Sequence, residues 1–286
     1  MQNNGHLARV GGARSSIILA SMNEQPDELA RYRLDGRVAL VAGGGGAIGS
    51  RLAMALAGVG ANVAVLNRST QHVAPIAQRL ESFGGKSLAL VGDVTKKDDV
   101  DRAVDQVVRE YGRFDIVVHA VGGGAGTALY PAEEYSPEEF DRIFELNFTS
   151  DLLVTQAAAR AMIKAGNGGH VLHISSVRGQ LGINAGYLAY VAAKGAINSI
   201  TRQQATEWAK YGINVNAIAP TFVRTPQVES MLADEAFYNG LVSRIPLRRI
   251  ADTDDLVGAV LFLCSDASSF VTGQILTLDG GLTATQ

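Results

Sequence analysis

The sequence predicts an α/β protein with a single doubly wound domain, in which helices cover both faces of a seven-stranded parallel sheet. Two observations support this prediction. From residue 37 onward, short runs rich in β-branched residues alternate strictly with helical stretches, as in repeated strand–helix–strand units. These runs are also apolar throughout, which is typical of strands buried on both faces. We expect three helices on each face of the sheet.

The predicted elements follow one another in a regular order. The strands are Val38–Ala42, Asn62–Asn67, Ser87–Val91, Ile116–His119, His170–Ser175, Asn214–Ile218 and Ile275–Leu278. The helical stretches between them are Ile48–Ala57, His72–Phe83, Lys97–Tyr111, Pro137–Lys164, Tyr187–Lys210 and Thr253–Cys264.

One irregular segment, about 221–249, breaks this rhythm. It is expected to be a loop with short helices at Gln227–Leu232 and Ala236–Val242. Because it follows a strand of a parallel sheet, it is a candidate substrate lid.

The composition is that of a globular protein. A chain of 286 residues, 47% of them hydrophobic, can bury the core of one domain of roughly 250 residues. The net charge of −3 does not point to nucleic acid or a membrane surface. No apolar run approaches the roughly 20 residues that span a bilayer, so we expect a cytoplasmic protein.

The number and spacing of the cysteine and histidine residues bear on disulfides and metal sites. The single cysteine, Cys264, excludes an internal disulfide framework and is expected in the core. The five histidines show no metal-ligand spacing, so no metal site is expected. Residues 1–33 have no sustained periodicity and are expected to form a flexible N-terminal extension, with the domain at 34–286.

A glycine-rich turn follows the first predicted strand and opens the first helix. It runs Gly43-Gly44-Gly45-Gly46-Ala47-Ile48-Gly49. Glycines allow the backbone to turn sharply and to approach a pyrophosphate at the helix N-terminus. A flexible turn is the plainer interpretation, but the position in a strand–helix unit favours nucleotide binding through Gly43, Gly46, Ile48 and Gly49.

The second predicted strand ends at Asn67-Arg68-Ser69. An acid here would bind the ribose 2′-hydroxyl of NAD, whereas an arginine accommodates a 2′-phosphate. The acid is missing, so the sequence favours NADP(H) and leaves NAD(H) possible. After the third strand, Asp93 can accept a hydrogen bond from the adenine amine or cap the next helix, and Val94 follows it.

The pair Tyr190 and Lys194 is the strongest sign of chemistry. Their i, i+4 spacing places phenol and ammonium on one helix face, and a neighbouring cation favours the phenolate. Such a pair also arises by chance, so its context matters. Ser176 ends the preceding strand region, and Asn147 lies in an otherwise apolar helical stretch, where its amide is expected to have a water or backbone partner.

Together these residues resemble the short-chain dehydrogenase/reductase family, from about residue 34 to the end. The family's Y-x-x-x-K is intact as Tyr190 and Lys194. Its glycine motif, T-G-x-x-x-G-x-G, reads Ala42-Gly43-x-x-x-Ala47-x-Gly49 here, and its N-N-A-G reads His119-Ala120-Val121-Gly122. The further cofactor contacts that the resemblance implies are Ala120, Gly122, Pro220, Val223 and Thr225.

The resemblance implies a Rossmann-type fold and hydride transfer between NAD(P) and a carbonyl or secondary alcohol. Tyr190 would give the proton, Lys194 would lower the pKa of Tyr190 and bind the nicotinamide ribose, Ser176 would position the carbonyl and Asn147 would hold a water. The implied substrate is a sugar acid, polyol or other small hydroxy or keto compound. The alternatives are a 3-oxoacyl thioester reductase and a catalytically silent nucleotide sensor.

Two arginines near the expected site, Arg178 and Arg224, can each hold a substrate carboxylate or be ordinary surface or interface charges. The resemblance also implies a homotetramer, and Ala157–Ala159 and Trp208 on the long helices are the apolar residues expected to contribute to its interfaces.

Overall fold

The structure, a computed structural model, describes residues 27–123 and 129–285. The chain separates into two units, residues 1–31 and 32–286. In the first unit the described residues begin at Asp27 and enter a short 3-10 turn, Glu28–Tyr32. The expected extension therefore lies mostly outside the described residues, and its flexibility stays a prediction.

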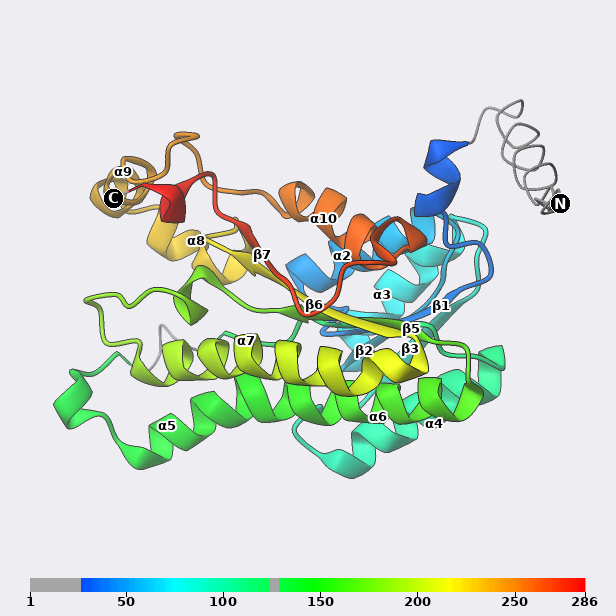
Figure 1. Cartoon of the computed structure of the whole chain (residues 1–286). Coiled ribbons are helices and arrows are strands. Elements are labelled where there is room, and N and C mark those ends of the chain that lie inside the picture. The colour runs from blue at the N-terminus through cyan, green and yellow to red at the C-terminus, as the bar shows by residue number, and fades with distance from the viewer. Residues whose placement is uncertain (1–26, 124–128, 286) are drawn as a thin grey trace, which may run out of the picture. The chain divides into compact units, whose positions relative to one another are not determined.

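The second unit is built on a seven-stranded parallel sheet, which confirms the predicted fold class (Figure 1). Its strands are β1 (Val38–Ala42), β2 (Asn62–Asn67), β3 (Ser87–Val91), β4 (Ile116–His119), β5 (Gly169–Ile174), β6 (Ile213–Pro220) and β7 (Ile275–Leu278). The strand order is β3-β2-β1-β4-β5-β6-β7. The order reverses between β1 and β4, and ligands of such sheets bind outside the carboxyl ends of the strands at this point.

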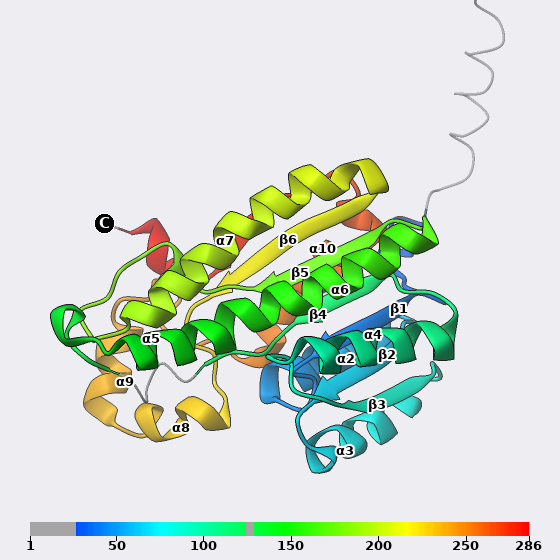
Figure 2. The same ribbon diagram turned by 90° about the horizontal axis from the view of Figure 1, so that it is seen from below.

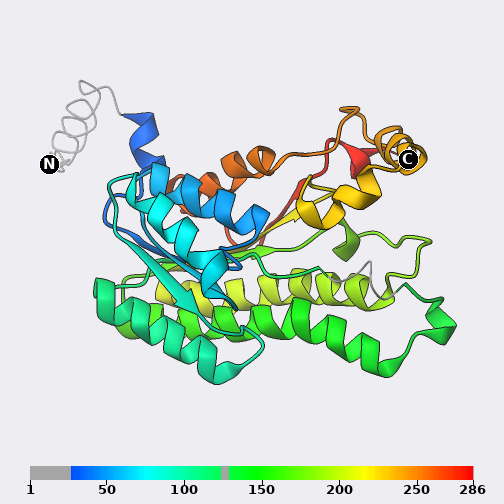
Figure 3. The ribbon, with the colours of Figure 1, turned by 180° about the vertical axis from the view of Figure 1, so that it is seen from behind.

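Helices cover the sheet on both sides, as expected (Figures 2 and 3). One face carries α2 (Ala47–Gly58), α3 (Thr70–Glu81) and α10 (Val257–Leu263). The other carries α4 (Lys97–Tyr111), α6 (Ser150–Ala165) and α7 (Leu188–Trp208), and α5 (Pro137–Phe144) packs against α7.

The sheet has an apolar core on each face, and successive side chains of β1 point alternately into one core and the other. Ala39 and Val41 pack with α2 and α10, whereas Val38 and Leu40 pack with α4 and α6. Cys264 is fully buried in the first core, as predicted. Burial raises the pKa of its thiol to about 12, so this cysteine is a packing residue.

The two edge strands depart from the expectation of burial on both faces. Val91 on β3 and Leu276 on β7 are exposed. The cause is their place in the sheet, because an edge strand has a neighbour on one side only. Hydrophobicity along the sequence did not distinguish these edge strands from central ones.

The helix predicted over 137–164 is confirmed as one continuous helical run from Pro137 to Ala165, although its geometry changes part-way. A π-helical segment, Glu145–Thr149, separates α5 from α6 and contains Asn147. Such segments insert an extra residue into a turn and are frequent at functional sites.

The segment after β6 folds into α8 (Pro226–Leu232) and α9 (Glu235–Val242), close to the two short helices predicted there. Its apolar residues Leu232, Leu241 and Ile245 form a separate small core with Val177. In the described part of the chain no helix is long and apolar enough to cross a membrane.

Candidate functional site

The glycine-rich turn lies at the carboxyl end of β1, beside the end of β4. Gly43 has φ +81°, and a Cβ there would lie 2.7 Å from the Ala120 carbonyl oxygen. A Cβ on Gly49 would clash with the carbonyl oxygen of Gly43. Both positions therefore require glycine, and the turn brings the N-terminus of α2, capped at Gly46, to the edge of the sheet. This arrangement fits the pyrophosphate of a dinucleotide.

The residues expected to select the cofactor lie beside this turn. A Cβ on Gly45 would lie 2.8 Å from Asn67 Nδ2, so the end of β2 closely approaches the turn. Asn67 Oδ1 accepts a hydrogen bond from Arg68 N at 2.7 Å. The Arg68 side chain is exposed, and the Ser69 hydroxyl makes no capping bond to α3. Arg68 and Ser69 thus remain available to a 2′-phosphate.

Asp93 lies on the adjacent strand end, near Arg68. Its Oδ1 accepts hydrogen bonds from Thr95 N at 2.9 Å and from Thr95 Oγ1 at 2.8 Å. Burial acts to raise the pKa of Asp93, but these bonds and the Arg68 charge outweigh it and lower the pKa. The N-cap of α4 is Lys96, so Asp93 closes a local turn instead of capping that helix. Val94 beside it is buried.

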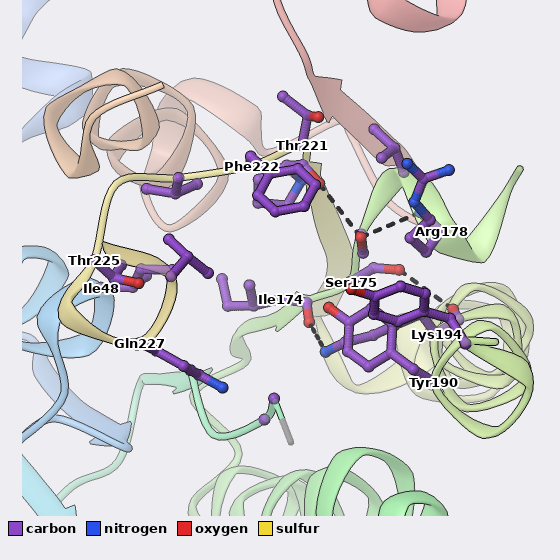
Figure 4. A pocket seen from close by; sticks show the side chains of 18 of the residues that line it. Ile48, Ile174, Ser175, Arg178, Tyr190, Lys194, Thr221, Phe222, Thr225 and Gln227 are labelled. Carbon is purple, nitrogen blue, oxygen red and sulfur yellow. Dashed lines mark hydrogen bonds between the residues drawn. The ribbon is translucent and has the colours of Figure 1, made fainter. Parts of the chain in front are cut away.

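A cavity of about 410 Å³ opens where the turn, β4, β5 and β6 meet (Figure 4). Many of the residues expected from the sequence line it together: Ile48, Ala120, Gly122, Ser176, Tyr190, Lys194, Pro220, Val223 and Thr225. Other lining residues, such as Ile183, Gln227 and Ser230, come from loops and α8 and had no sequence signal of their own.

Tyr190 and Ser176 face each other across this cavity. Burial raises the pKa of the Tyr190 phenol, while a hydrogen bond with the Ser176 side chain and the charge of Arg178 act to lower it. The net direction is upward, so the phenol holds its proton at neutral pH. Ser176 Oγ also accepts a hydrogen bond from Arg178 N at 3.1 Å, which fixes the serine in its turn.

Lys194 projects from the same face of α7 as Tyr190, and its ammonium donates to the Ile174 carbonyl at 2.7 Å. The Nζ atom lies 5.7 Å from the centre of the Tyr190 ring. Burial lowers the pKa of Lys194 to about 8, although Asp151 acts in the opposite direction. The effect of Lys194 on the pKa of Tyr190 stays a prediction.

Asn147 makes backbone contacts from the π-helical segment. Its Oδ1 accepts from Gly123 N at 2.9 Å, and its Nδ2 donates to the carbonyls of Gly123 at 3.0 Å and Ile143 at 2.8 Å. The amide therefore has the backbone partners expected for it and joins the loop after β4 to the helix. A Cβ on Gly122 would approach both Asn147 Oδ1 and Lys194 Nζ, so this loop closely approaches the catalytic candidates.

The two adjacent serines have different partners. Ser175 Oγ donates to Asn198 Oδ1 at 2.6 Å, toward α7. Ser176 Oγ instead donates to the Pro220 carbonyl at 3.5 Å, at the end of β6. This division supports the choice of Ser176 as the serine of the site.

The two candidate arginines are separated by the fold. Arg178 is buried and lines the cavity. Arg224 is exposed, is not among the lining residues and pairs with Asp252 at 3.7 Å. Only Arg178 can therefore act within the site.

A buried network beneath the site was missed from the sequence. Asp151 on α6 lies between two imidazoles, with 2.6 Å from its Oδ1 to His173 Nδ1 and 3.1 Å from its Oδ2 to His119 Nδ1. His173 Nε2 is 3.0 Å from Gln204 Oε1 on α7. These residues are far apart along the chain, so their spacing gave no signal.

Comparison with known proteins agrees with this geometry. A family model described as enoyl-(acyl carrier protein) reductase matches residues 43–283. A structure of a short-chain type dehydrogenase/reductase from Mycobacterium marinum superposes with a TM-score of 0.84 at 35% identity, covering 90% of this chain and 99% of that one. The chain belongs to the short-chain dehydrogenase/reductase family.

Relatives within the family include sugar-acid enzymes. Gluconate 5-dehydrogenase of Gluconobacter oxydans is 37% identical over 252 residues, 88% of this chain and 96% of the relative. A gluconate 5-dehydrogenase from Burkholderia cenocepacia J2315 in complex with NADP and tartrate has a TM-score of 0.85 at 36% identity, covering 90% of this chain and 99% of that one. This family member is thus an oxidoreductase that interconverts a carbonyl and an alcohol with a nicotinamide cofactor.

Proposed function

We propose that this enzyme reduces a ketone group of a small keto compound, and oxidises the corresponding alcohol, with Tyr190 as the general acid and base. The observation that carries the proposal is that Tyr190, Ser176 and Lys194 line one cavity at the carboxyl ends of the strands. A protonated phenol in this position can donate directly to a substrate oxygen.

The roles of the side chains follow from their contacts. Tyr190 holds a proton at Oη and, in reduction, passes it to the carbonyl oxygen. Ser176 orients that oxygen, and Lys194 fixes the ribose end of the cofactor from its anchor on Ile174 O. Asn147 holds the loop after β4 in place and can bind a water behind Lys194. A bound nicotinamide supplies the hydride, while the protein supplies position and electrostatics.

We propose NADP(H) as the preferred cofactor. The support is the exposed Arg68 guanidinium beside Ser69 and the absence of an acid at Asn67, next to a glycine turn shaped for a pyrophosphate. The gluconate 5-dehydrogenase of Burkholderia cenocepacia was solved with NADP. Contacts from Gly43, Gly46, Ile48 and Gly49 would come mainly from the backbone.

For the substrate we propose a sugar acid, a polyol or a related hydroxy or keto compound, in line with relatives named for gluconate. The second candidate is a 3-oxoacyl thioester, in line with the relative from Thermotoga maritima that is named 3-oxoacyl-[acyl-carrier-protein] reductase. The segment 221–249, which contributes Phe222 and Met231 to the cavity, is the proposed substrate lid.

The test is turnover of a ketone panel with NADPH by the purified protein and by Tyr190→Phe. The substitution removes only the hydroxyl, so cofactor binding is expected to stay within a few-fold of the wild type. The rate is expected to fall by about 10²–10⁴-fold or more. A Tyr190→Phe enzyme that keeps most of its activity would overturn the assignment. A wild type that binds NADPH but turns over no member of the panel would favour the silent sensor.

Assembly as a homotetramer and a location in the cytoplasm are further proposals. They are supported by the family relationship and by the nearly balanced charge of the chain.

A further inference from the structure

The cavity carries positive charge without a matching acid. Among the described residues that line it, Lys194 and Arg178 are the charged side chains, and there is no aspartate or glutamate. The Lys194 ammonium is bonded to the Ile174 carbonyl and has a place in the proposed mechanism. Arg178 has no such role yet.

The Arg178 side chain is buried with most of its hydrogen-bonding capacity unused. The residue is 7% exposed, and its Nη1 donates to the Gly182 carbonyl at 3.1 Å. A guanidinium has five N–H donors. Within residues 27–123 and 129–285, no carboxylate lies within 4 Å of Arg178 and no other side-chain hydrogen bond is formed by it. A buried cation without a counter-ion is costly, so the site favours an anion from outside the chain.

We propose that Arg178 binds a carboxylate of the substrate, so that the enzyme acts on small keto and hydroxy acids in preference to neutral polyols or thioesters. The inference rests on the proposed function and names its substrate class. Arg178 follows Ser176 by two residues in one tight turn, so the carboxylate would lie close to the carbonyl that Ser176 orients. A planar guanidinium matches a carboxylate in a bidentate pair.

The experiment compares a keto sugar acid with the neutral ketose of the same chain length, using NADPH and the variants Arg178→Met and Arg224→Met. For the acid, Arg178→Met is expected to lower kcat/KM by about 10²-fold or more, mainly through KM, because a buried charge pair is lost. For the ketose the loss should be at least about tenfold smaller than for the acid, because the ketose has no carboxylate to pair with Arg178. Arg224→Met is the matched control, because Arg224 is exposed and pairs with Asp252 outside the cavity.

Arg178 also acts on Tyr190, and the same experiment separates the two roles. If Arg178→Met lowers kcat/KM equally for acid and ketose and shifts the pH profile of both, the arginine works through the phenol and the proposal is overturned. A wild type that uses the ketose as well as the acid overturns it too.

Binding provides a readout that does not depend on turnover. Calorimetry of the NADP-loaded protein with the keto acid should show binding for the wild type and Arg224→Met, and a large loss for Arg178→Met. Arg178→Lys keeps the charge but loses the planar guanidinium, so it should show an intermediate loss, and it serves if Arg178→Met does not fold. Absence of acid binding to the wild type overturns the inference, whereas binding without turnover of any ketone would count against the proposed function alone.

Discussion

At the scale of single residues, the site depends on what burial does to three ionisable groups. Burial raises the pKa of Tyr190 and lowers the pKa values of Lys194 and Arg178. Each shift disfavours the charged form, as expected in a poorly solvated cavity. The phenol therefore starts as an acid, and an anionic ligand that enters the cavity encounters poorly solvated cations.

Lys194 gives a pH-dependent prediction for stability. Its pKa is about 8 in the folded protein, against about 10.4 in an unfolded chain. The native lysine therefore holds fewer protons than the unfolded one between these values, and stability contributed by this site rises with pH across that window. The free energy of unfolding of Lys194→Met should exceed that of the wild type most at pH 7, and this difference should shrink by pH 10.

The measurement is guanidinium unfolding at pH 7, 8.5 and 10, with Lys164→Met as the control on an exposed lysine at the end of α6. A difference between Lys194→Met and the wild type that is independent of pH would contradict the assigned shift.

Arg68 gives a prediction for cofactor choice. Arg68→Asp replaces a cation that can pair with a 2′-phosphate by an acid that can accept from a ribose 2′-hydroxyl. We expect the ratio of kcat/KM for NADPH over NADH to fall by about tenfold or more, because one charge-assisted contact is typically worth at least 1.5 kcal/mol. Steady-state rates with both cofactors measure this. A wild type already faster with NADH at low concentration would show that the preference was assigned wrongly.

At the scale of elements, one buried polar network joins four of them. His119 is on β4, Asp151 on α6, His173 on β5 and Gln204 on α7. Ser150, next to Asp151, donates to the Leu146 carbonyl at 2.6 Å, so the network continues into the π-helical segment that presents Asn147. The catalytic candidates are thus held in position by hydrogen bonds as well as by apolar packing.

Asp151→Asn tests this network. Burial would raise the pKa of Asp151, but His173 and His119 outweigh it and hold the pKa far below its usual range. Loss of the charge should destabilise the protein by about 1.5–3 kcal/mol per charge-assisted hydrogen bond lost. Because the folded pKa is lowered, this contribution is complete above about pH 4 and is lost as the pH falls below it.

Urea unfolding at pH 7, 5 and 3.5 follows the difference between wild type and variant, and Asp141→Asn, an exposed acid on α5, is the control. If Asp151→Asn is as stable as the wild type at pH 7, the network does not stabilise the fold.

At the scale of the whole molecule, the apolar residues first expected at the interfaces are used inside the subunit. Ala157, Ala158 and Ala159 are buried, and Trp208 packs against the core beside α4 and α6. A row of partly exposed aromatic rings remains along α5 and the π-helical segment, with Phe140 to Phe144 at 5.7 Å and Phe144 to Phe148 at 4.9 Å between ring centres.

The proposed assembly has a direct test. Light scattering at micromolar concentration should give a mass several times the 30.1 kDa of one chain. Phe144→Asp, which places a charge in the aromatic row, should lower that mass, because a buried charge without a partner destabilises an interface. A wild-type mass of a single chain would end the proposal, and an unchanged mass for Phe144→Asp would move the interface away from this face.

The sequence by itself determined the order of the strands and both boundaries of five of the seven, and it identified many of the residues that line the cavity. It could do so because strand and helix periodicity, the glycine turn and the Tyr190–Lys194 spacing are local properties of the chain. The strands β1, β2, β3, β4 and β7 have the bounds expected from the sequence.

Only the tertiary structure decided what depends on neighbours from distant segments. It placed β3 and β7 at the edges of the sheet and gave the turn of the long helix around Asn147 a π-helical geometry. It also buried Arg178 in the cavity while leaving Arg224 outside, and it brought His119 and His173 to Asp151. Contacts between distant segments set the burial, the charge partners and the pKa of each side chain. Two arginines, Arg178 and Arg224, therefore differ in their surroundings although the sequence did not distinguish them.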